Sequence, residues 1–178
     1  MSMSLIEKVI SLENHDELHT VRLLVLISTI VGKKRETTIQ ITKLAKLDFI
    51  LRYPAALYKA LDFVNGLKDA LITESEKNNI ESEMLAFNYS PWSSDFRRLL
   101  VLLTSRSLIS WSSKGNSIEL SLTKQGEDFY NKIIRYQEFS EIIQQSKSIK
   151  TNFSKLSMLK LDSVLSEILN PINLYKHL

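Results

Sequence analysis

Hydrophobic positions change their period twice between residues 97 and 130. A run of apolar residues over 99–103 predicts a helix. Apolar and polar residues then alternate over 108–122, which predicts two β-strands around a turn at Lys114, Gly115 and Asn116. Thr123 follows as a helix N-cap, and the helical period resumes behind it. This stretch therefore predicts a helix, a β-hairpin and a capped second helix, in that order.

Helix, hairpin and capped helix together are typical of a winged helix, which is a binding fold more often than a catalytic one. Only 4 Gly and 3 Pro interrupt the chain, so long helices are expected elsewhere. We predict a mainly α fold with a small β-hairpin, that is, a winged helix-turn-helix with additional C-terminal helices. We expect a winged-helix domain over 1–130, with an acidic insert near 67–90, and a C-terminal helical extension over 131–178.

The first third of the chain is predicted to be largely helical. The expected helices cover residues 1–14, 17–31, 43–51 and 55–64. Gly32 ends the second of these as a C′ residue, and Thr42 caps the third. Residues 37–41 are rich in β-formers and predict an edge strand. Pro54 breaks the chain after Tyr53 and opens the fourth helix.

Two helices with apolar stripes are predicted beyond the hairpin, over 124–146 and 153–169, with a polar interruption over 147–152. Such a stripe must be buried, either within the domain or on another chain. We expect an interface with another subunit, although an intramolecular helical hairpin is the alternative. The residues expected at this interface are Ile133, Tyr136, Phe139, Ile143, Leu156, Leu159 and Leu165.

Positive charge is concentrated in one part of the sequence. The whole chain carries a net charge of +3, whereas residues 33–52 hold six basic residues against two acidic ones, a local charge of +4. Such a cluster favours contact with phosphates, although lysines that only solvate helix ends are the alternative. The candidates for contact with DNA are Lys33, Lys34, Arg35, Lys43 and Lys46, together with Lys114 at the hairpin turn.

The composition limits the compartment and the chemistry. Cys is absent, which excludes disulfides and thiolate sites and suits a reducing cytoplasm. The longest apolar-rich run covers 23–31, far short of the roughly 18–20 residues that span a bilayer, so no membrane is expected. His15 and His19 stand four residues apart, but no third metal ligand has a fixed spacing to them. With no phosphate-binding GxxxxGK[ST] loop and no nucleophile elbow, we predict no catalytic, cofactor or metal site.

Three segments resemble a known family. They are RLLVLI leading to GKKR over 22–35, TKLAKLDFILRYP over 42–54, and YSPW followed by FRRLL over 89–100. Together they are similar to the winged-helix middle component of bacterial ABC-three-component systems, which themselves resemble Lamassu-type defence against phages and plasmids. The resemblance covers about residues 18–130.

The resemblance implies a non-catalytic subunit. Its partners would be an SMC-like coiled-coil ATPase and an effector, often a nuclease, and it would bridge them. The basic cluster separately predicts a weak contact with double-stranded DNA without sequence preference. The alternative is a free-standing winged-helix transcription regulator, which would carry polar and basic residues on its recognition helix. Here the helix over 96–106 is apolar in its middle and has arginines at its ends, which favours a protein-facing helix.

Overall fold

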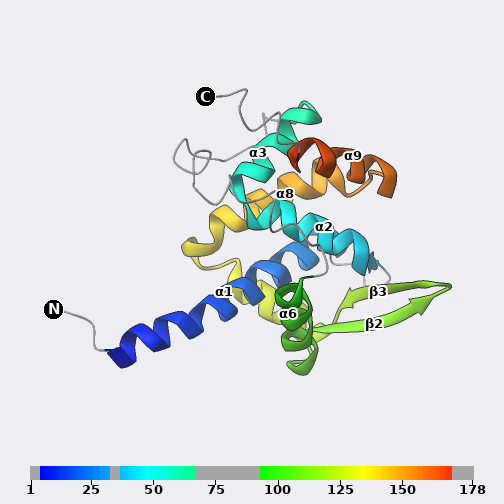
Figure 1. Cartoon of the computed structure of the whole chain (residues 1–178). Helices are drawn as coiled ribbons and strands as arrows, with labels where there is room; N and C mark the ends of the chain where they lie inside the picture. Colours follow the sequence, from blue (N-terminus) through cyan, green and yellow to red (C-terminus); the bar gives the residue numbers. More distant parts are fainter. Residues whose placement is uncertain (1–4, 33–36, 67–92, 170–178) are drawn as a thin grey trace.

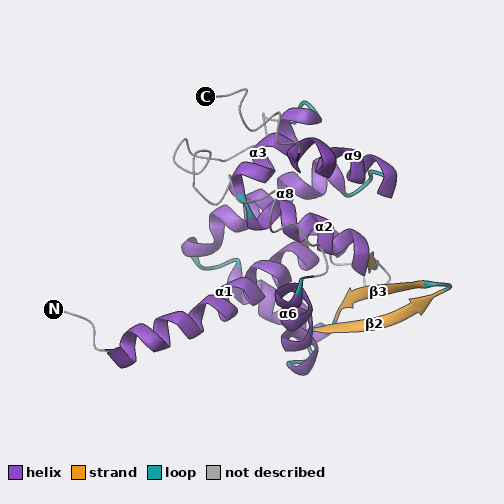
Figure 2. Cartoon of the chain, viewed as in Figure 1, coloured by secondary structure: helices purple, strands orange, loops and turns teal. Residues whose placement is uncertain are grey.

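The computed structural model describes residues 5–32, 37–66 and 93–169, and this part of the chain is mainly helical with one small antiparallel sheet (Figures 1 and 2). The elements are α1 (Leu5–Val31), β1 (Ile39–Gln40), α2 (Ile41–Arg52), α3 (Pro54–Phe63), α6 (Ser94–Ser105), β2 (Ile109–Lys114), β3 (Ser117–Leu122), α7 (Lys124–Ile133), η3 (Gln137–Phe139), α8 (Ser140–Phe153) and α9 (Met158–Leu169).

The sheet has the strand order β1-β3-β2, with both pairings antiparallel. The predicted hairpin is confirmed, because β2 and β3 pair along their full length and Lys114 lies opposite Ser117 across a two-residue loop. Gly115 in that loop has a φ of +59°, which glycine adopts without strain. The predicted edge strand is confirmed as well, since Ile39 of β1 pairs with Leu120 of β3. The hairpin extends away from the helices (Figure 2).

Helix α1 forms the centre of the core. Its residues 23–27 are five consecutive buried side chains, so this part of the helix is covered on every side. The elements that pack around it are α2, α6, α7, α8 and the sheet. Helix α9 packs against α3 and α2 (Figure 1). The core therefore includes residues from both sides of position 130, among them Phe153, Leu161 and Leu165.

Several predicted helix ends are confirmed. The hydroxyl of the predicted cap Thr123 accepts a hydrogen bond from the Gly126 amide at 3.0 Å. Of the two serines that could cap α6 by sequence, Ser93 and Ser94, it is Ser93 whose hydroxyl accepts a hydrogen bond from the Phe96 amide at 3.2 Å. Gly32 follows α1 with a φ of +69°. Pro54 occupies the first turn of α3 behind an extended Tyr53. These signals act over a few residues, so the local sequence suffices to predict them.

Other predicted boundaries are wrong. Helix α1 continues from Leu5 to Val31, without the break expected near residues 15–16. The N-cap of α2 is Gln40, and Thr42 lies inside the helix. The helix predicted over 124–146 is interrupted: it ends as α7, is followed by the short 3-10 helix η3, and restarts as α8. The polar stretch 147–152 is helical because it packs on the core: Ile149 and the small Ser148 are buried.

Candidate partner and nucleic-acid interfaces

Helix α6 has one face in the core and one face in solvent. Its buried side chains are Phe96, Leu99, Leu100 and Leu103. The exposed face carries Arg97, Arg98 and Thr104, and between them lies Val101, whose side chain is 65% exposed. The helix is therefore amphipathic, and a bare aliphatic side chain stands in the middle of its outer face.

The hairpin also exposes apolar side chains, on one of its two faces. Directly paired side chains of two antiparallel strands lie on one face of the sheet. On one face Trp111 lies opposite Leu120, and Ser113 lies opposite Ile118. Leu120 is buried in the core, whereas Trp111 is 42% and Ile118 is 49% exposed. The opposite face is polar, and there the hydroxyls of Ser110 and Ser121 are 2.8 Å apart.

One hydrogen bond joins the exposed face of α6 to the hairpin. The Trp111 indole Nε1 donates to the Thr104 hydroxyl at 2.8 Å, which itself donates to the Leu100 carbonyl. Val101 lies one turn from Thr104 on the same side of α6. Val101 therefore lies on the side of α6 that faces Trp111, and Ile118 shares the face of Trp111 on the hairpin. We call these three exposed side chains, Val101, Trp111 and Ile118, the hairpin patch.

A buried ion pair lies behind α6, between α1 and α2. The guanidinium of Arg22 donates to the Asp48 carboxylate at 3.2 Å, and both side chains are buried. The same guanidinium contacts Nδ1 of His19, while its Nε has no hydrogen-bond partner among the described residues. An ion pair taken out of water must keep both members, because an unpaired buried charge is strongly destabilising.

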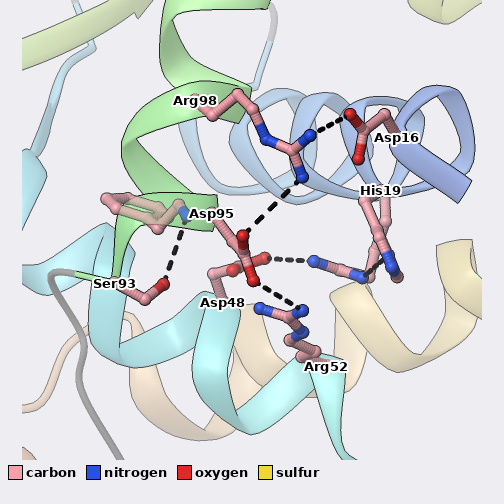
Figure 3. A network of polar contacts seen from close by, with 9 residues as sticks. Asp16, His19, Asp48, Arg52, Ser93, Asp95 and Arg98 are labelled. Atoms are coloured by element: carbon pink, nitrogen blue, oxygen red, sulfur yellow. Dashed lines mark hydrogen bonds and ion pairs between the residues drawn. The ribbon is translucent and has the colours of Figure 1, made fainter.

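A second set of polar contacts lies near this pair and joins α6 to α1 and α2 (Figure 3). Asp95, in the first turn of α6, accepts a hydrogen bond from Arg52 of α2 at 3.4 Å and lies 3.7 Å from Arg98. Arg98 also pairs with Asp16 of α1. Ser93 caps the same end of the helix. These contacts fix the N-terminal turn of α6 against α1 and α2.

The candidate DNA contacts do not form one open patch in the described structure. Lys33, Lys34 and Arg35 lie outside the described residues. Lys43 points to the end of α8, where its ammonium donates to the carbonyls of Ser154 at 2.6 Å and Leu156 at 2.8 Å. Burial lowers the pKa of Lys43. Lys46 pairs with Asp162 of α9. Lys114 is exposed at the end of the hairpin.

Lys43 and Lys46 thus have a structural role in this arrangement. The four carbonyls at the end of a helix lack partners within that helix, and a cation there is favourable. Lys43 supplies this cation to α8, and Lys46 links α2 to α9. The expectation that both ammonium groups face phosphates is not supported by where they lie.

The predicted partner interface on the C-terminal helices is wrong for most of its residues. Ile133, Ile143 and Leu165 are buried in the chain's own core, and Phe139 and Leu156 pack against it. The physical reason is that α7 and α8 cover α1, and α9 packs on α3 and α2, so the apolar stripes of these helices are buried within the chain. Tyr136, 59% exposed, and Leu159, 81% exposed, are the two candidates that face solvent.

A shallow hollow of about 370 Å³ opens between α7, η3 and α8. Its lining includes Tyr136 together with Arg135 and Lys147, so it combines an aromatic ring with two cations. No group of three or more acidic or histidine side chains suited to a metal ion occurs among the described residues. In that same part of the chain, no helix combines the length and apolar character needed to cross a membrane.

Sequence reasoning missed the hairpin patch and the polar contacts behind it. The alternating pattern placed Trp111 and Ile118 on the apolar face of the hairpin, but it could not tell how far the core extends under that face. Arg22 and Asp48 are 26 residues apart and belong to two different helices. One signal in the sequence could have indicated the hairpin patch: Trp111 is a single aromatic residue in a serine-rich strand.

No family model, curated protein or solved structure matches the chain.

Proposed function

We propose that this chain is a non-catalytic winged-helix subunit that binds a protein partner through the hairpin patch. The order of the described elements supports the winged-helix assignment: α1, β1, α2, α3, α6 and then the hairpin. The pairing of β1 with β3, the second strand of the hairpin, agrees with it as well. In such a fold α6 takes the place of the recognition helix, and β2 and β3 form the wing.

The observation that carries the proposal is the exposure of Val101, Trp111 and Ile118 on two elements, α6 and the hairpin, that the hydrogen bond between Trp111 and Thr104 joins. Burying such a side chain on a partner contributes about 1.5–3 kcal/mol. Exposed aromatic and aliphatic side chains that are clustered on a rigid support are typical of the energetic centre of a protein interface. The wing and α6 provide that support, because both are tied to the core by hydrogen bonds and ion pairs.

Protein is favoured over DNA as the main partner because few cations on this face are free of carboxylates. Arg98 pairs with Asp16 and Asp95, and Arg106 lies 4.0 Å from Glu17. Two cations remain, Arg97 on α6 and Lys114 on the wing; among the described residues neither lies within ion-pair distance of a carboxylate. Affinity for DNA rises with the number of phosphates neutralised, so these two support a weak, sequence-independent contact.

The class of partner follows from the sequence resemblance. A middle component of an ABC-three-component system would bridge an SMC-like coiled-coil ATPase and an effector in anti-phage or anti-plasmid defence. Chemistry would then belong to those partners. A free-standing transcription regulator is the second candidate. The exposed Arg97 and Lys114, on the recognition helix and the wing, are the observation in its favour.

Co-expression with the proteins encoded by the adjacent open reading frames tests the proposal. The variants are Val101→Asp and Ile118→Asp in the hairpin patch, with Leu159→Asp as the matched control, since Leu159 is the most exposed of the original interface candidates. We expect at least a tenfold loss of co-purified partner for the first two and no loss for the control. The melting temperature of all three should stay within a few degrees of the unmodified chain.

The opposite result would overturn the proposal. If Leu159→Asp abolishes co-purification while Val101→Asp and Ile118→Asp retain it, the interface lies on the C-terminal helices. If the unmodified chain captures no adjacent gene product and binds a specific DNA sequence instead, the chain is a regulator.

A further inference from the structure

Strand β2 has a free edge that lacks the usual protection. It lies at the border of the sheet, and its only strand partner among the described residues is β3. Sheet edges in natural proteins are normally blocked by charges, proline, bulges or very short strands. β2 is six residues long and reads Ile-Ser-Trp-Ser-Ser-Lys, with its single charge at the last position. Its register with β3 is unbroken, so it contains no bulge.

The hairpin register determines which backbone groups of β2 face outward. A two-residue loop closes on a hydrogen-bonded pair, here Lys114 and Ser117, and such pairs alternate along antiparallel strands. Ser112 and Ser110 therefore bond to β3 as Lys114 does. The amide and carbonyl groups of Trp111 and Ser113 point away from β3 at the exposed part of the edge. Backbone groups of this kind bind another strand readily.

We propose that β2 is a docking edge that takes an extended strand of the partner, so that the sheet grows by one strand. This inference rests on the proposed function and specifies its mode of binding. Trp111 and Ser113 would supply the main-chain hydrogen bonds, and the hairpin patch would receive side chains from one face of the added strand. Strand addition of this kind takes affinity from the main chain and specificity from alternate side chains.

The chemistry around the edge defines the strand that fits it. Side chains of the added strand that lie on the side of Trp111 should be apolar, because they would lie beside the hairpin patch. Those on the other side would lie near Ser110 and Ser112 and should be small or polar. An acidic residue is expected near the end of the hairpin, where Lys114 is exposed, since opposite charges on neighbouring strands attract each other.

Charge also favours a partner over a second copy of this chain. The one charge of β2 is Lys114, and the strand has no acidic residue. Glu119 lies on the same face of the hairpin as Lys114, but its carboxylate accepts a hydrogen bond from Thr38. A second copy joined edge to edge through β2 would therefore bring another lysine and no carboxylate to this edge. A strand that carries an acidic residue would complement Lys114.

A proline at one position of β2 provides the test. In Ser113→Pro the lost amide is one that faces away from β3, so the hairpin keeps its own hydrogen bonds, and proline is tolerated at such an edge position. Ser113→Ala keeps the amide and serves as the matched control. In co-expression with the adjacent gene products, we expect at least a tenfold loss of co-purified partner for Ser113→Pro and less than a twofold change for Ser113→Ala.

Amide hydrogen exchange of the unmodified full chain gives a second readout that needs no variant. In the free chain, the amides of Ser110 and Ser112 should exchange slowly because they bond to β3. The amides of Trp111 and Ser113 should exchange fast. In the complex, these two should slow at least tenfold, so that all four amides are protected.

Three results would overturn the inference. Co-purification of Ser113→Pro at the level of the unmodified chain, with fast exchange at Trp111 in the complex, would exclude strand addition. If Val101→Asp still abolishes binding in that case, the proposed function stands and only the mode of binding is wrong. Protection of Trp111 and Ser113 in a dimer of the chain alone would make a second copy the occupant. Failure of the unmodified chain to bind any adjacent product would remove the proposed function as well.

Discussion

The hairpin region and the C-terminal helices both carry apolar residues at regular spacing, yet they differ in what covers them. The stripe of α8 is buried because it packs on α1, and Ile143, Ile149 and Phe153 belong to the core. The outer half of the hairpin extends beyond that core, so Trp111 and Ile118 remain in solvent. An apolar pattern therefore indicates that burial is favourable, but it does not tell which surface provides it.

The largest expected effect is on stability, and it tests whether the apolar residues of the C-terminal helices are buried within this chain. Phe153 is fully buried at the end of α8. Phe153→Ala should lower the free energy of unfolding by about 3–5 kcal/mol, because it removes a large buried side chain and leaves a cavity. Leu159→Ala, at an exposed position of α9, should change it by less than about 0.5 kcal/mol. Urea denaturation followed by circular dichroism measures both values.

A small effect for Phe153→Ala, similar to that of Leu159→Ala, would contradict the packing described here. It would mean that α8 is held against another chain and contributes little to the stability of this one. The original expectation of a subunit interface on the C-terminal helices would then return.

The next effect concerns the buried ion pair between α1 and α2. Asp48→Ala should cost about 3 kcal/mol, because it leaves the Arg22 guanidinium buried and unpaired between α1 and α2. The double variant Arg22→Met with Asp48→Leu should cost clearly less than the single one, since no charge is then left in the interior. Thermal and urea unfolding of the three chains give the comparison. Equal losses for the single and double variants would show that side-chain volume, not charge, is what matters at this position.

The smallest effect on stability distinguishes two lysines, Lys43 and Lys114, that the sequence grouped as candidate DNA contacts. Lys43→Met should cost about 2 kcal/mol, because the charged hydrogen bonds to the carbonyls of Ser154 and Leu156 are lost. Lys114→Met, at an exposed position of the hairpin, should leave stability unchanged within about 0.5 kcal/mol.

DNA binding by the same two variants gives a further readout. We expect Lys114→Met to weaken any sequence-independent binding and to reduce its salt dependence by about one unit of the log–log slope, since one phosphate contact is lost. Lys43→Met should leave both unchanged. A loss of DNA affinity for Lys43→Met in a chain that remains folded would show that Lys43 contacts phosphates after all. Titration at several salt concentrations measures the slope.

Much of the local structure could be predicted from the sequence, because its causes lie within a few residues. The caps at Ser93 and Thr123, the extended Tyr53 before Pro54, and the hairpin around Gly115 belong to this class. The break between α7 and α8 could not be predicted. It follows an ordinary Ile133 with no proline or glycine nearby, and it depends on how the two helices pack on α1.

The sequence by itself determined the helical character of the chain, the position of the hairpin, and the local backbone signals that begin and end its elements. These follow from periodicity and from the φ preferences of single residues. Only the tertiary structure decided which apolar side chains stay in solvent, which lysines stabilise helices, and where the buried pair of Arg22 and Asp48 lies. The reason is that burial and ion pairing depend on the neighbours that a residue acquires from distant parts of the chain, and a pattern along one segment does not contain them.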